Sequence, residues 1–67
     1  MTQVALKEMP AGAQLHRILS FHATAADALA AVPGTIISSE EDADHPGYWD
    51  VAAARGSALT IYCIEPA

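Results

Sequence analysis

Internal disulfide bonds cannot stabilise this chain, because its 67 residues include only one cysteine, Cys63. The same scarcity excludes a metal site built from several cysteines of one chain. A chain of this length buries only about 60% of the surface that it exposes when unfolded, so its core alone gives marginal stability. Association with a second molecule is the remaining general way to bury more apolar surface.

Positive charge is also scarce, with Lys7, Arg17 and Arg55 set against eight Asp and Glu residues and a formal net charge of −5. So few cations cannot neutralise a run of phosphates, and anionic lipid repels such a chain. No apolar run approaches the ~20 residues that cross a bilayer, and the N-terminus lacks the basic region and apolar core of a signal peptide. We therefore expect a cytoplasmic protein that binds neither nucleic acid nor membranes.

Apolar side chains are abundant, at 52% of the residues against 16% that are charged. This balance is typical of folded rather than disordered chains, and we expect a single domain over residues 1–67. Residues 1–12 form either an edge strand or a mobile N-terminal arm. The alternation through Val4 and Leu6 favours the strand, whereas the following Met9-Pro10-Ala11-Gly12 interrupts it.

The segment 48–64 predicts a β-hairpin in which Gly56-Ser57 is a two-residue turn. This turn would place residue 51 opposite 62, 49 opposite 64, 52 opposite 61 and 54 opposite 59. Both faces of the hairpin would then be apolar, so a single helix cannot cover both and one face remains for a partner. One face carries Trp49, Val51, Tyr62 and Ile64, and the other carries Ala52, Ala54, Leu59, Ile61 and Cys63.

The first half of this hairpin has an alternative as a helix over residues 45–55. Asp44 suits the N-cap, Pro46 suits the first turn, and Gly56 suits the residue after the last turn. The aromatic and β-branched residues at positions 48–51 favour a strand, as does the turn signal that follows them. We prefer the strand and keep the helix as the alternative.

Three elements are expected upstream of the hairpin. Thr24-Ala25-Ala26-Asp27 resembles a capping box that starts a short helix, which ends at Pro33-Gly34. Residues 35–39 are β-branched and predict a strand. Residues 14–22 alternate as a strand. One face of that strand would carry Leu15, Arg17, Leu19 and Phe21, and the other His16, Ile18, Ser20 and His22.

These elements together predict an α+β domain with the order β-α-β-β-β. One short helix would pack on one face of a three- or four-stranded sheet, mixed or antiparallel. If residues 45–55 are helical, the order becomes β-α-β-α-β and the sheet more nearly parallel.

Five of the eight acidic residues lie between positions 40 and 50, and this segment is the candidate for metal or acid–base chemistry. Carboxylates suit hard divalent cations, and an imidazole adds affinity for zinc or manganese. The spacing does not match an EF-hand, because Pro46 and Ala53 occupy two positions that should supply ligands. We expect a mobile, solvated loop and no cofactor. The weak metal candidates are Asp42, Asp44, His45 and Asp50.

Two functions follow from these patterns. The preferred one is a non-catalytic interaction or regulatory module that forms a homodimer through its open sheet face and also offers a surface to a protein partner. Its candidate binding residues are Tyr48, Trp49, Tyr62 and Ile64, although Trp49 on its own is better explained by core packing. The alternative is a small metal-dependent or acid–base enzyme centred on residues 40–50, with His45 as general base. Cys63 is expected to be a buried, unreactive thiol.

Overall fold

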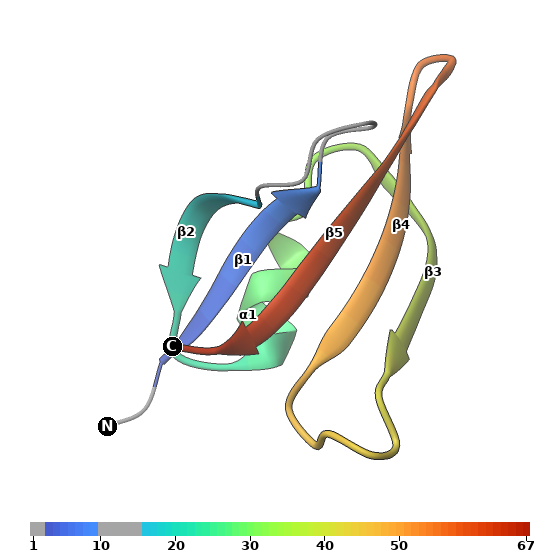
Figure 1. The fold of residues 1–67 in the computed structure, drawn as a ribbon. Helices are drawn as coiled ribbons and strands as arrows, with labels where there is room; N and C mark the ends of the chain where they lie inside the picture. The colour runs from blue at the N-terminus through green and yellow to red at the C-terminus, as the bar shows by residue number, and fades with distance from the viewer. Residues whose placement is uncertain (1–2, 10–15) are drawn as a thin grey trace.

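The structure is a computed structural model that describes residues 3–9 and 16–67. These residues form one antiparallel sheet of five strands and one short helix, which confirms the α+β class (Figure 1). The spatial order of the strands is β2-β1-β5-β4-β3. In chain order the elements are β1 (Val4–Met9), β2 (Arg17–His22), α1 (Ala25–Ala30), β3 (Thr35–Glu41), β4 (Trp49–Arg55) and β5 (Ala58–Pro66).

The strand count and order differ from the predicted β-α-β-β-β, because the chain begins with a hairpin of two strands rather than one. β1 is not an edge strand: it lies between β2 and β5. Its alternation is short, but Leu6 faces Ile64 of β5 and both side chains are fully buried, so tertiary packing fixes the strand. Residues 1–2 and 10–12 of the predicted arm, and residues 14–15 of the next predicted strand, lie outside the described residues.

The hairpin of β4 and β5 has the predicted register, with Val51 opposite Tyr62 and Trp49 opposite Ile64. Residues 49–55 are therefore a strand, and the helical alternative over 45–55 is wrong. Gly56 opens the turn at a φ of +64°, a left-handed conformation that glycine adopts without steric cost. The turn residue and the β-forming side chains together outweigh the helix-forming alanines.

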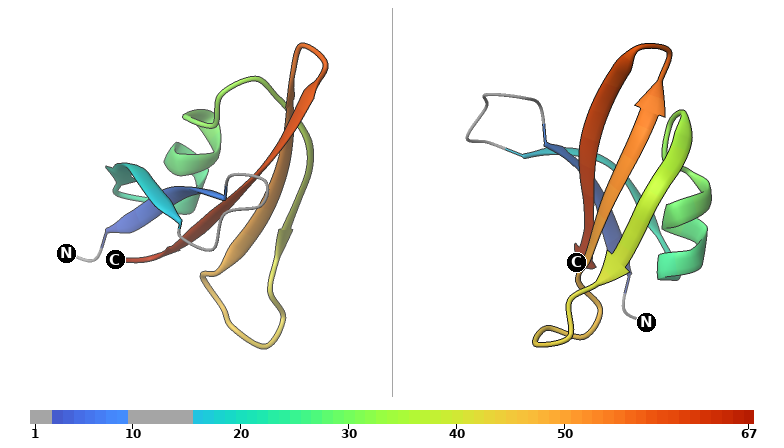
Figure 2. Two further views of the ribbon diagram at one scale, coloured as in Figure 1. Left: turned by 45° about the horizontal axis from the view of Figure 1, so that its top comes forward. Right: turned by 90° about the vertical axis from the view of Figure 1, so that its right-hand side faces the viewer.

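Helix α1 begins as the capping signal predicts: the Asp27 backbone N–H donates to Thr24 Oγ1 at 3.1 Å. The helix lies on one side of the sheet, over β1, β2 and β5 (Figure 2). Its small residues allow a close approach, and Ala28 is fully buried. The core between helix and sheet consists of Leu6, Ala28, Val32, Val51, Ala53, Tyr62 and Ile64.

Both edge strands contain a bulge. In β2 the partners of Leu6 and Lys7 are Ser20 and Ile18, so Leu19 is the extra residue. In β3 the extra residue is Ile37. The first bulge turns Leu19 towards the core and leaves Phe21 exposed, so the prediction that these two side chains share a face is wrong.

Candidate functional site

The sheet face opposite α1, called here the open face, carries large apolar side chains that water reaches. The strand register places Ile18 and Phe21 of β2 and Leu59 and Ile61 of β5 on this face. Their exposed fractions are 52%, 53%, 61% and 39%, in that order. Ala52 and Ala54 lie between β5 and the edge and add further apolar surface. The open face therefore carries exposed apolar side chains on β2 and β5 and small apolar ones on β4.

An ion pair crosses the middle of the open face. Lys7 of β1 donates to Glu65 of β5, and both side chains are about three-quarters buried. The hydrogen bond to Glu65 raises the pKa of Lys7, so the ammonium stays charged and paired. The one lysine of the chain therefore has an ion-pair partner within the same chain.

Cys63 lies at the centre of the open face, on the middle strand of the sheet. A single row of partners crosses all five strands here, running Ile18, Lys7, Cys63, Asp50 and Glu40. Cys63 is buried, as the sequence predicted. Burial is the main cause that raises its thiol pKa; the charges of Glu65 and Asp50 add to the rise and that of Lys7 opposes it. A raised pKa leaves less of this thiol as thiolate at neutral pH.

His16 lies beside this thiol, with its Nδ1 atom 3.9 Å from Cys63 Sγ. A cavity of about 200 Å³ opens next to the two side chains. Its wall also includes Asp50, Tyr48 and Glu65. The fold thus brings an imidazole, a thiol and carboxylates to one place on the open face.

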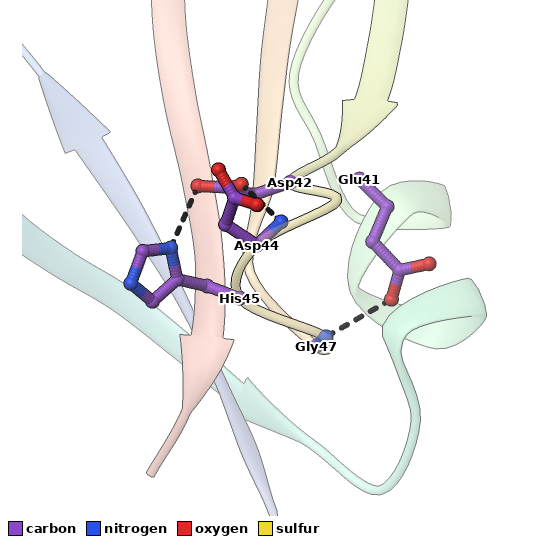
Figure 3. Close-up of polar contacts among 5 residues, drawn as sticks. All are labelled: Glu41, Asp42, Asp44, His45 and Gly47. Atoms are coloured by element: carbon purple, nitrogen blue, oxygen red, sulfur yellow. Dashed lines mark hydrogen bonds and ion pairs between the residues drawn. The ribbon is translucent and has the colours of Figure 1, made fainter.

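The connection from β3 to β4 is a hydrogen-bonded turn (Figure 3). Asp42 Oδ1 accepts from the backbone N–H of Asp44 at 2.9 Å, and Asp42 Oδ2 lies 3.1 Å from His45 Nδ1. Glu41 accepts from the backbone N–H of Gly47 at 2.9 Å. These contacts give the loop a hydrogen-bonded conformation, and its mobility stays a prediction. The pKa of Asp42 is lowered mainly by the hydrogen bond that its carboxylate accepts from the Asp44 backbone N–H. The hydrogen bond with the His45 side chain is the second cause.

The four metal candidates do not form a ligand cage. Both oxygens of Asp42 bond within the loop, and Asp44 and His45 lie on its exposed turn. Asp50 belongs to the open face, although it shares a hollow of about 260 Å³ with Asp42. Across residues 3–9 and 16–67, no three His, Cys, Asp or Glu side chains are arranged to hold a metal.

The four candidate binding residues occupy different environments. Tyr62 and Ile64 are buried beneath α1, and half-buried Trp49 packs against the same core. Tyr48 is exposed, with its ring edge-on to His45 at a centroid distance of 5.9 Å. The exposed apolar surface is therefore on the other hairpin face, together with Ile18 and Phe21 of β2, which the sequence did not single out.

Comparison of the chain with protein-family models, curated proteins and solved structures finds no match. Within the described part of the chain, no helix has the length and apolar character to cross a membrane. We therefore infer a function from the geometry of the open face and of the acidic loop.

Proposed function

We propose that this protein is a non-catalytic module that self-associates by packing the open faces of two copies against each other. The observation that carries the proposal is the set of four exposed side chains Ile18, Phe21, Leu59 and Ile61 on one face of a very small domain. Their exposed fractions together equal about two whole large side chains, or ~400 Å² per copy. Two copies would bury ~800 Å² from these residues alone, half of the ~1,600 Å² of a standard interface.

Small apolar neighbours supply more of the required area. Met9, Ala52 and Ala54 lie on the same face, and the Lys7–Glu65 pair leaves no unpaired ammonium to be desolvated. Stacked sheets bury such a face by interdigitating their side chains. These side chains add to the apolar area of the open face, which supports its role as one half of a small dimer interface.

The edges of the sheet support association through the face rather than by sheet extension. Bulges at Leu19 and Ile37 interrupt both edge strands, and β3 ends in Glu40 and Glu41. Bulges and charged side chains are devices by which proteins keep sheet edges from pairing. A face-to-face dimer would leave the acidic loop of each copy free to meet a further protein partner.

Two exposed apolar residues provide a matched test. Ile61 on the open face and Ile36, which faces Ala53 on the α1 side of the sheet, are exposed to 39% and 38%. We expect Ile61→Ser to raise the dimer dissociation constant at least about tenfold in sedimentation velocity, because the lost apolar area is buried only in the dimer. Ile36→Ser should leave that constant unchanged. Equal effects of the two substitutions would contradict the assignment of the interface.

A further inference from the structure

The contact between Cys63 and His16 has the spacing of two ligands on one zinc ion. A thiolate and an imidazole bound to tetrahedral Zn²⁺ lie ~3.6 Å apart, from a Zn–S bond of ~2.3 Å and a Zn–N bond of ~2.0 Å. The observed distance between Cys63 Sγ and His16 Nδ1 is 3.9 Å. A cavity of about 200 Å³ borders both side chains and gives room for an ion.

One chain supplies only part of such a site. Structural zinc sites take four ligands, and within the described residues no third ligand joins Cys63 and His16. A second copy of the chain would supply the same pair again. Two cysteines and two histidines are one of the common ligand sets of structural zinc.

The position of Cys63 in the sheet suits a site shared by two copies. It lies on β5, the third of five strands, in the middle of the row that crosses the open face. In a face-to-face dimer the two-fold axis runs in the plane between the sheets. A residue at the centre of the face then meets its own equivalent, whichever direction in that plane the axis takes.

The spacing of stacked sheets fits a shared metal and not a disulfide bond. Packed sheets lie ~10 Å apart, whereas the Cα atoms of a disulfide lie ~4.4–6.8 Å apart. Two thiolates on one zinc ion lie ~3.8 Å apart, and each Cα lies ~2.8 Å from its Sγ, so a zinc ion between two Cys63 residues spans ~9 Å.

Charge on the open face also favours a bound cation. Asp50 lies next to Cys63 in the central row and Glu40 follows it, and neither makes an ion pair within the described residues. Lys7 is already paired with Glu65. Stacking two such faces brings carboxylates of the two copies closer together, and a divalent cation offsets their repulsion.

We infer that two copies of this chain, associated through their open faces, hold one Zn²⁺ ion with Cys63 and His16 of each copy. The inference rests on the self-association proposed above and adds a metal that stabilises it. Each Cys63 thiol releases its proton as the Zn–S bond forms, so binding weakens as the pH falls.

Cobalt(II) is the spectroscopic probe for this site. Titration of the metal-free protein with Co²⁺ should saturate at one ion per two chains, with a thiolate-to-cobalt charge-transfer band and the visible absorption of a tetrahedral site. Cys63→Ser should abolish the charge-transfer band, and His16→Gln, at an exposed position, should weaken Co²⁺ binding at least about tenfold. His22→Gln is the matched control, because His22 bonds to Ser20 away from Cys63, and it should bind Co²⁺ like the wild type.

Sedimentation with Zn²⁺ or with a chelator separates the two proposals. We expect Zn²⁺ to tighten the dimer at least about tenfold and the chelator to reverse this. If neither Zn²⁺ nor the chelator changes the dimer dissociation constant, the metal site is wrong and the self-association proposal is still supported. A monomer under both conditions overturns both proposals. Cobalt spectra that Cys63→Ser leaves unchanged would assign the metal to other ligands and also overturn the inference.

Discussion

Trp49 is a large side chain whose removal should cost much of the stability of the domain. It opens β4 opposite Ile64 and packs against the core on the side that α1 covers. Truncation to alanine removes ~150 Å² of apolar surface from that contact, worth ~4 kcal/mol at ~25 cal/mol per Å². A chain of 67 residues has only ~3–10 kcal/mol of total stability. Trp49→Ala should therefore remove a large share of the free energy of unfolding and lower the urea midpoint clearly.

Urea unfolding followed by circular dichroism measures this effect, because the signal does not depend on the tryptophan itself. The protein concentration must be held fixed, since association adds to the apparent stability. Tyr48→Ala is the neighbouring control: its ring is 43% exposed, and we expect a change below ~1 kcal/mol. If Trp49→Ala kept the wild-type midpoint, Trp49 would not be part of the core and the packing argument would be refuted.

Two further perturbations test the backbone and the acidic loop. Gly34→Ala should lower the thermal midpoint more than Gly56→Ala: both glycines have positive φ, but a Cβ at Gly34 meets the carbonyl of Ala54 and one at Gly56 meets nothing. An equal loss at both sites would refute the steric argument. The lowered pKa of Asp42 means that its contacts stabilise the fold above the unfolded-state pKa of ~3.9, and this contribution is lost as the pH falls through the folded-state pKa. Asp42→Asn should therefore weaken the pH dependence of urea unfolding below about pH 4, and an unchanged dependence would contradict the assigned contacts.

Local signals predicted the elements whose geometry a few neighbouring residues determine. The Gly56-Ser57 turn was enough to give the register of β4 and β5, and Thr24 was enough to place the start of α1. Both depend on backbone conformations and bonds formed within a few residues. Such features depend little on contacts with distant parts of the chain.

Features that depend on distant contacts were not predicted. Each bulge adds one residue to an edge strand, and nothing in the alternation around Leu19 or Ile37 marks it. Both faces of the β4–β5 hairpin are apolar, so only the position of α1 decides that Tyr62 is core. His16 and Cys63 lie 47 positions apart in the sequence. Their contact depends on the strand order, in which only β1 lies between β2 and β5.

The central claim is that a second copy covers the open face, and intermolecular contacts measured by isotope-filtered NMR test it most directly. An equimolar mixture of labelled and unlabelled protein reports only contacts between copies. We expect cross-peaks from the side chains of Ile18, Phe21, Leu59 and Ile61 to the other copy and none from Ile36, which lies on the α1 side of the sheet. Cross-peaks confined to β3 or α1, or a complete absence of intermolecular cross-peaks from a folded protein at high concentration, would contradict the claim.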